Sequence, residues 1–372
     1  MSAISTIIRD ADAWIDRERT GERLLDDLQR SGCVIYGAGG YGRDVAQALQ
    51  ERDVTVHFFI DGNALPEQEV EGIPVLRRED VPVRECAAVI AINNFQVDIR
   101  EIADWSVDRF SDVLFVPEFP DIISPKLGNY WQAPRRIISE NSGSLEALWS
   151  SLSDAKSRQV LEELVTYRMR AAPRFHPDVD RQNQYFSSDL PLAEKELSVV
   201  DCGAFPGDML AAAKNAGHSV KEWYAFEPDL DNFSRLAAIA RGEPKISASL
   251  FPCGVGDKTG LFSFSGGSAD ASRASAEGEA GTPVPIVRVD DVLVSERIDM
   301  VKLDIEGFEA QAIDGMADLL RRHRPRLCVA IYHKPADLWQ LPAKVKSMFP
   351  DARLAIRQHG YNGYDTVLYA DL

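Results

Sequence analysis

Several carboxylates and one histidine directly follow apolar runs in the C-terminal half of the sequence. Asp201 lies inside the small-residue turn of "VVDCGAFPGD", and Glu227 closes "YAFEP". Asp304 and Glu306 follow a third run in "VKLDIEGFE", and His333 ends a fourth in "VAIYH". Short apolar runs of this kind predict buried strands, and open parallel sheets place their sites at the carboxyl ends of their strands. The sequence therefore predicts that acids and an imidazole meet at one edge of a sheet.

The turn after the first of these runs predicts the ligand. Gly203 and Gly207 allow the backbone to approach a bound molecule, while a carboxylate at Asp201 disfavours a phosphate and favours an ammonium or a sulfonium. S-adenosylmethionine carries both cations. Glu227 is placed to accept the two ribose hydroxyls of its adenosine. With Asp304, these residues are the candidate cofactor-binding set.

Methyl transfer from a sulfonium needs a positioned nucleophile and, where that nucleophile is a hydroxyl, the removal of one proton. His333 and Asp304 are the candidate bases, and the ordinary pKa of histidine suits the role at neutral pH. Glu306 and Asp304 either bind Mg²⁺ or Ca²⁺, which would hold two acceptor oxygens, or act separately, with Glu306 capping the next helix. Lys302 is expected to share the strand face of Asp304 and to neutralise it. The alternative for His333 is a hydrogen-bonding residue at a strand end, and for Asp201 a turn-forming acid.

A second glycine-rich turn, "GAGGYG", lies near the N-terminus. Gly37, Gly39 and Gly42 stand between the strand-like "CVIY" and the helical "RDVAQALQ", and Asp61 closes the next apolar run. This is the spacing of a dinucleotide-binding turn, in which an acid reads a ribose hydroxyl. The alternative is that the glycines only let the helix pack closely on the strand. No residue in this half is typical of a hydride-transfer site.

Apolar runs alternate with polar helical segments in both halves, which predicts an α/β protein with two doubly wound parallel sheets. Two strands joined by "YNGY" predict a closing antiparallel hairpin at the C-terminus. We expect N-terminal helices and a small nucleotide-binding domain over residues 1–125, a helical connector over 126–195 and the second sheet over 196–372. Residues 265–285 are rich in Ser, Ala, Gly and Glu and are expected to form a flexible loop or lid.

The formal net charge of −17 argues against nucleic acid as a partner. The five cysteines show no metal-binding spacing and are expected to be reduced core residues. No stretch approaches the roughly 18 apolar residues of a membrane span, and no signal pattern precedes the first helix. We therefore expect a cytoplasmic protein, and the sequence leaves a homo-oligomer open.

Residues 184–372 resemble FkbM-type methyltransferases, a class I S-adenosylmethionine-dependent family. The stretches that carry the resemblance are "QYF", "VVDCGAFPGD", "YAFEPDLDNF", "VRVDDVL", "VKLDIEGFE", "YHKPADLW" and "DTVLYADL". The resemblance implies a class I methyltransferase fold and O-methylation of a sugar, a glycan precursor or a secondary metabolite. The stretch from "GAGGYG" to "AAVIAIN" resembles the front domain of bacterial sugar-modifying acetyltransferases, which implies a nucleotide or nucleotide-sugar ligand.

Two other functions remain open at this point. One is an NAD-dependent oxidoreductase that uses the first sheet, although a hydride-site acid and base are missing. The other is a non-catalytic protein that retains a nucleotide pocket, although Asp201, Glu227, Asp304 and His333 all stand at strand ends where chemistry would need them.

Overall fold

The computed structural model describes residues 3–18, 21–116, 135–170, 173–265, 273–275, 282–293 and 297–372. They form two compact units. Unit 1 comprises Met1–Glu146, Gln159–Asp178 and Gly360–Tyr364, and unit 2 comprises Ala147–Arg158, Val179–His359 and Asp365–Leu372. The segment expected to be a separate connector thus contributes to both units, and the boundaries at residues 125 and 195 stay a prediction.

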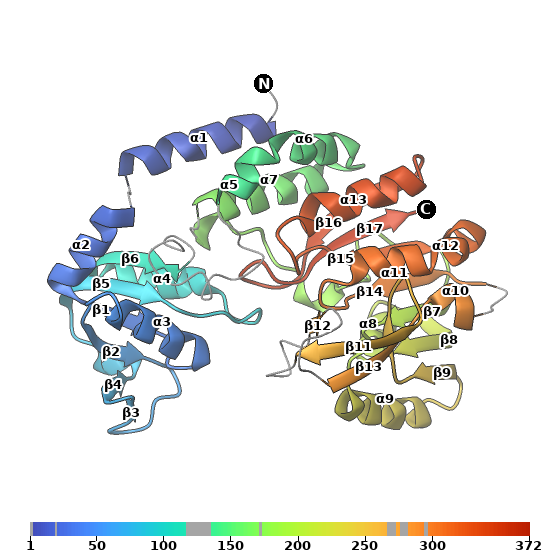
Figure 1. Ribbon diagram of the computed structural model, residues 1–372, viewed down its shortest axis with the longest axis horizontal. Coiled ribbons are helices and arrows are strands. Elements are labelled where there is room, and N and C mark those ends of the chain that lie inside the picture. Colours follow the sequence, from blue (N-terminus) through green and yellow to red (C-terminus); the bar gives the residue numbers. More distant parts are fainter. Residues whose placement is uncertain are drawn as a thin grey trace. The chain divides into compact units, whose positions relative to one another are not determined.

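Unit 1 is built on a six-stranded sheet with the strand order β3-β4-β2-β1-β5-β6 (Figure 1). All its pairs are parallel except β3 with β4. The strands are β1 (Cys33–Tyr36), β2 (Val56–Ile60), β3 (Glu69–Val70), β4 (Ile73–Leu76), β5 (Arg84–Ile90) and β6 (Phe110–Phe115). The parallel sheet expected from the alternating pattern is confirmed.

Helices cover both faces of this sheet, as the burial of β1 shows. Cys33 and Ile35 pack in one apolar cluster, whereas Val34 and Tyr36 pack in another. Successive side chains of a strand point to opposite faces, so a run that is apolar at every position requires cover on both sides. The helices that belong wholly to unit 1 are α1 (Ala3–Glu18), α2 (Gly21–Ser31), α3 (Gly40–Gln50), α4 (Ile99–Val107) and α5 (Arg135–Glu140), with a 3₁₀ turn at Arg78–Asp80.

Two helices of the predicted connector contribute residues to both units. These are α6 (Ser142–Ser151) and α7 (Ala155–Arg170), and two 3₁₀ turns follow at Pro173–Phe175 and Arg181–Asn183. The helical character expected for residues 126–195 is present in their described part. Residues 117–134 lie outside the described residues.

Unit 2 is built on a seven-stranded sheet with the order β16-β17-β15-β14-β7-β8-β9. Only β17 runs antiparallel, to both β15 and β16, so the expected closing hairpin is confirmed. The strands are β7 (Glu196–Cys202), β8 (Ser219–Phe226), β9 (Ser247–Phe251), β14 (Met300–Leu303), β15 (Arg326–Ala330), β16 (Arg353–Gln358) and β17 (Thr366–Asp371). The helices are α8 (Asp208–Asn215), α9 (Leu230–Gly242), α10 (Val289–Val292), α11 (Glu309–Gly315), α12 (Ala317–His323) and α13 (Asp337–Met348).

A small four-stranded sheet corrects the expectation for residues 265–285. It has the order β10-β13-β11-β12, with β10 (Gly254–Val255), β11 (Gly260–Ser265), β12 (Arg273–Ser275) and β13 (Thr282–Val287). The segment expected to be a loop therefore contains β12 and the start of β13. β12 and β13 are held by backbone hydrogen bonds to β11. The composition of the segment, which is poor in large apolar residues, gave no sign of this backbone pairing. Residues 266–272 and 276–281 lie outside the described residues.

His176 holds the segment Gly360–Tyr364 within unit 1. Its Nδ1 lies 2.8 Å from the carbonyl oxygen of Pro177, and the backbone N–H of Gly363 donates to its Nε2 at 3.0 Å. Both contacts are satisfied only by the neutral ring with the proton on Nδ1. Burial, assisted by the charge of Arg100, lowers the pKa of His176 to about 4.

We expect acid to loosen this contact. The folded-state pKa of His176 lies below that of the unfolded chain, so its stabilising contribution is present above about pH 6.5 and is lost as the pH falls towards 4, a change of about 3 kcal/mol. Amide hydrogen exchange at Gly363, corrected for intrinsic rates, should show protection that declines over this range. The decline should persist in His57→Gln and disappear in His176→Gln; protection that is flat in the unaltered protein would contradict the assignment.

Candidate active site

The strand ends singled out in the sequence lie in adjacent strands of unit 2. In the pairing of β7 with β14, Asp201 is opposite Lys302 and Cys202 is opposite Leu303. The backbone N–H of Asp304 then donates to the carbonyl of Cys202 at 3.2 Å, so the chain after β14 continues alongside the turn after β7. β15, which leads to His333, pairs with the other edge of β14. The predicted meeting of acids and imidazole at one sheet edge is therefore found.

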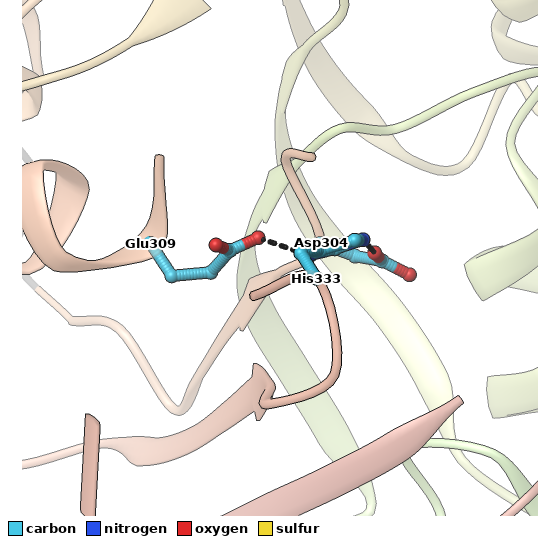
Figure 2. A group of neighbouring side chains, drawn as sticks. All are labelled: Asp304, Glu309 and His333. Atoms are coloured by element: carbon cyan, nitrogen blue, oxygen red, sulfur yellow. Dashed lines mark hydrogen bonds and ion pairs between the residues drawn. The ribbon is translucent and has the colours of Figure 1, made fainter. Parts of the chain in front are cut away.

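His333 lies between two carboxylates (Figure 2). Its Nδ1 is 2.8 Å from Oε1 of Glu309 in α11, and its Nε2 is 3.3 Å from Oδ1 of Asp304 and 3.8 Å from Oε2 of Glu306. The side chains of His333 and Glu309 are each 1% exposed. Nε2 approaches Asp304 without the alignment of a hydrogen bond.

These charges bear on the role expected of His333. Burial alone would lower its pKa, but the carboxylates of Glu309 and Asp304 outweigh burial and hold the pKa well above its usual range. The two acids therefore favour the protonated ring, with Nδ1 against Glu309 and Nε2 facing Asp304. A protonated ring is a poor acceptor for a hydroxyl proton, so these contacts weigh against His333 as the base, and its catalytic role stays a prediction.

Asp304 and Glu306 are the more exposed acids of the cluster. The side chain of Asp304 is 21% exposed and that of Glu306 is 38% exposed. The hydroxyl of Tyr185 donates to Oδ2 of Asp304 at 2.6 Å. Burial opposes the charge of Asp304, but His333 and Lys302 overcome it and hold its pKa well below its usual range. Asp304 is thus a fixed anion that presents part of its surface at the sheet edge.

Asp201 is deep in the core, at 0% exposure. Trp223 Nε1 donates to its Oδ2 at 3.2 Å, and Lys302 Nζ lies 3.2 Å from its Oδ1. Lys302 also donates to the carbonyl of Gly203. Burial would lower the pKa of Lys302, but Asp201 and Asp304 raise it above its usual range. Lys302, expected to neutralise Asp304, therefore pairs directly with Asp201, and Asp201 is committed to internal partners.

The glycines of the turn after β7 are required by its backbone. Gly203 has φ +73°, and a Cβ there would lie 1.9 Å from the carbonyl oxygen of Asp304. Gly207 has φ +98°, and its Cβ would lie 3.2 Å from the Trp223 ring. Glu227 accepts from the backbone N–H of Phe205 at 2.7 Å and from that of Asp229 at 2.9 Å. Both carboxylate oxygens of Glu227 thus already accept hydrogen bonds from the backbone, and the one from Phe205 lies within the turn itself.

The first glycine turn has a similar construction in unit 1. Gly37 has φ +112°, and a Cβ on Gly42 would lie 1.9 Å from the Gly37 carbonyl oxygen. The N–H of Ala38 donates to Oδ2 of Asp61 at 3.1 Å. A Cβ on Gly39 would meet nothing within 4 Å. Close packing therefore explains Gly42, while Gly39 leaves open space beside the start of α3.

Among the described residues, one group of three could hold a metal ion, namely Asp304, Glu309 and His333, with candidate ligand atoms within 4.8 Å of one another. The expectation of Mg²⁺ or Ca²⁺ rested on two carboxylates alone. The structure adds an imidazole to them, a donor that these hard cations use much less than transition ions do.

Comparison with known proteins identifies the domains. Residues 201–362 match the model of the methyltransferase FkbM domain, and residues 33–100 match that of the PglD N-terminal domain. The chain therefore contains an FkbM methyltransferase domain. Methyltransferase FkbM from Methylobacillus flagellatus KT shares its fold, with a TM-score of 0.78, 21% identity and 99% of each chain covered. No curated protein matches the sequence.

Two further solved structures resemble this methyltransferase more weakly. An rRNA methylase from Streptococcus thermophilus has a TM-score of 0.32 at 15% identity, with 48% of this chain and 87% of the other covered. A SAM-dependent methyltransferase from Aquifex aeolicus has a TM-score of 0.28 at 12% identity, with 47% and 81% covered. Separately, none of the helices in the described part of the chain is both long and apolar enough to cross a membrane.

Two residues of the methyltransferase site were missed in the sequence. Glu309 belongs to the "DIEGFE" string, and its spacing after the turn could have indicated it, since its Oε1 also accepts from the backbone of Ile305 at 2.9 Å and of Gly307 at 3.3 Å. Asp365 follows the hairpin tip and hydrogen-bonds Tyr332 and Gln184. Burial and the charge of Asp304 raise the pKa of Asp365 to about 7. Only the fold brings Asp365 to this edge.

We predict that the buried pair of Lys302 and Asp201 is essential to the stability of the methyltransferase unit. Lys302→Met leaves Asp201 as an unpaired buried charge, so the free energy of unfolding should fall by about 3–5 kcal/mol, measured by chemical denaturation of the full chain. Lys214→Met, at an exposed position of α8, should change it little. Adding Asp201→Asn to Lys302→Met should recover part of the loss. Equal free energies of unfolding for Lys302→Met and Lys214→Met would contradict this account.

Proposed function

We propose that this methyltransferase uses S-adenosylmethionine to methylate a hydroxyl of a sugar, a glycan precursor or a secondary metabolite. The observation that carries the proposal is that the glycine turn after β7 and the acidic edge after β14 lie side by side, joined by the Asp304 N–H to Cys202 carbonyl hydrogen bond. A donor held on the turn would place its methyl group near the edge where Asp304 and Glu306 are exposed. Proximity and orientation of this kind are the main requirement of methyl transfer.

The positions of the cofactor candidates define their proposed roles. Gly203 and Gly207 supply the close backbone approach, and Glu227 fixes the turn at Phe205 as well as standing where a ribose would be read. Asp201 acts through Lys302, which holds the carbonyl of Gly203. Asp304 and Glu306 face the acceptor, and one of these carboxylates would take the hydroxyl proton as the methyl group leaves the sulfonium. His333 keeps Asp304 ionised and oriented.

The setting that we propose is a reducing compartment, the cytoplasm, with a small molecule as partner. All five cysteines are free and buried. Burial raises the pKa of Cys33 and of Cys328 to about 12, so both thiols stay protonated and inert. The net charge of −17 supports a small-molecule acceptor over a nucleic acid.

The donor site is tested by calorimetric titration of the full chain with S-adenosylhomocysteine. We expect saturable micromolar binding, and at least a tenfold loss of affinity in Gly203→Ala, because the new methyl group would displace the turn from Asp304. Gly217→Ala is the matched control: its φ is +81°, but a Cβ there would meet nothing within 4 Å. Thermal melting checks that both variants fold. Absence of binding to the unaltered protein would refute the donor assignment, as would equal affinities of the two variants.

We also propose that the PglD N-terminal domain of this chain binds a nucleotide or nucleotide-sugar at the turn formed by Gly37, Gly39 and Gly42. The support is the open space at Gly39 and Gly40 beside the N-terminus of α3, where backbone N–H groups attract a phosphate. Asp61 stabilises the turn by accepting a hydrogen bond from the backbone N–H of Ala38. It directly follows β2, where a ribose would lie.

A bulky side chain at Gly39 should block this second site without disturbing the fold, because the position has ordinary backbone angles and free space. We expect UDP to bind the full chain in a calorimetric titration and to lose at least tenfold in affinity in Gly39→Val. Gly143→Val, an exposed position of unit 1 that also has no neighbour within 4 Å of a Cβ, is the control. NAD is titrated in parallel. Preference for NAD over UDP would contradict the nucleotide-sugar proposal.

A further inference from the structure

Nε2 of His333 is a buried nitrogen whose surroundings need an explanation. The side chain is 1% exposed, and Nε2 makes no hydrogen bond. Buried polar atoms are almost always hydrogen-bonded, and leaving one without a hydrogen bond is destabilising. Two carboxylate oxygens face this nitrogen instead, Oδ1 of Asp304 at 3.3 Å and Oε2 of Glu306 at 3.8 Å.

These separations match those between ligands of a common metal ion. Bonds of about 2.0–2.2 Å to nitrogen and carboxylate oxygen, in a tetrahedral arrangement, place the ligand atoms about 3.4 Å apart. The contacts from Nε2 to Asp304 and Glu306 bracket this value. Both carboxylates would have to turn towards each other to share an ion with Nε2, and Glu306, at 38% exposure, has the more room to move.

The opposite side of the ring is arranged as in metal-bound histidines. Histidine ligands generally donate their other nitrogen to a carboxylate, which fixes the ring and its tautomer. Glu309 Oε1 is 2.8 Å from Nδ1 of His333 and accepts in addition from the backbone N–H groups of Ile305 and Gly307. Those two residues flank Glu306, whose φ is +56°. Glu309 therefore fixes the ring and the turn that presents Glu306 at the same time.

We propose that Nε2 of His333, Oδ1 of Asp304 and a carboxylate oxygen of Glu306 bind one divalent transition-metal ion, with Glu309 as the residue that orients the histidine. One imidazole and two carboxylates suit Zn²⁺ or Mn²⁺, whereas Mg²⁺ prefers oxygen ligands and water. The ion would replace the proton that otherwise lies between the ring and the acids. This site shares Asp304 and Glu306 with the acceptor edge of the proposed active site, and metal binding can be measured without the methyl donor.

The proposal is tested by titrating the chelator-treated full chain with Zn²⁺, Mn²⁺ and Mg²⁺ in a calorimeter. We expect one Zn²⁺ per chain, with Mn²⁺ weaker and Mg²⁺ at least 100-fold weaker than Zn²⁺. His333→Ala should lower the Zn²⁺ affinity at least 100-fold, and Glu309→Gln should lower it 10- to 100-fold. His218→Ala is the control, because its Nδ1 lies 2.9 Å from the carbonyl oxygen of Glu194 and its ring packs against Phe186 instead of the three carboxylates.

The partly exposed Glu306 keeps the test decisive if His333→Ala does not fold. Glu306→Gln should melt near the unaltered protein and bind Zn²⁺ at least tenfold more weakly. The proposal is overturned if Zn²⁺ fails to bind, or if it binds Glu306→Gln and the unaltered protein equally. S-adenosylhomocysteine is titrated into the same samples, so a missing metal site leaves the donor assignment to be judged on its own.

Discussion

The buried ion pair of Lys302 and Asp201 is the interaction on which the site depends. It joins the neighbouring strands β14 and β7, and the same ammonium donates to the carbonyl of Gly203 at the start of the glycine turn after β7. Lys302 Nζ also lies 5.5 Å from the centre of the Tyr185 ring, whose hydroxyl donates to Asp304. One buried cation therefore positions both the turn and the acid that we propose to face the acceptor. Because its desolvation is costly, any change that removes its partners weakens the whole edge.

The remaining charges are arranged so that opposite signs alternate. Lys302 lies against Asp201, His333 lies between Asp304 and Glu309, and Glu306 completes the edge. Alternation favours the charged forms of His333 and Asp304, as the raised pKa of His333 and the lowered pKa of Asp304 indicate. It also leaves the exposed side of the cluster anionic. Such an edge attracts a cation or a hydroxyl donor and repels a phosphate, in agreement with a sulfonium cofactor.

The sequence predicted where the site lies better than what its residues do. Apolar runs followed by small or acidic residues located the ends of β7, β8, β14 and β15, because strand burial depends on local pattern. The role of His333 could not be read in this way, since its charge depends on Glu309 and Asp304, which the fold brings to either side of the ring. Asp365 had no signal at all, because it reaches the edge only through the hairpin. Strand β12 was also not predicted, because it forms by backbone pairing with β11, whereas the composition of the segment predicted a loop.

In both glycine turns, the carboxylate after the neighbouring strand accepts a hydrogen bond from the backbone of the turn. In unit 1 the carboxylate after β2, Asp61, accepts from the backbone of Ala38 at 3.1 Å, and in unit 2 the carboxylate after β8, Glu227, accepts from that of Phe205 at 2.7 Å. Both acids were predicted as ribose readers, yet each already holds the turn of the preceding strand in shape. A ligand that hydrogen-bonds such an acid meets a turn that is preorganised to receive it, which reduces the ordering cost of binding. Replacing either acid would therefore change the turn as well as the contact, and a loss of affinity would measure both.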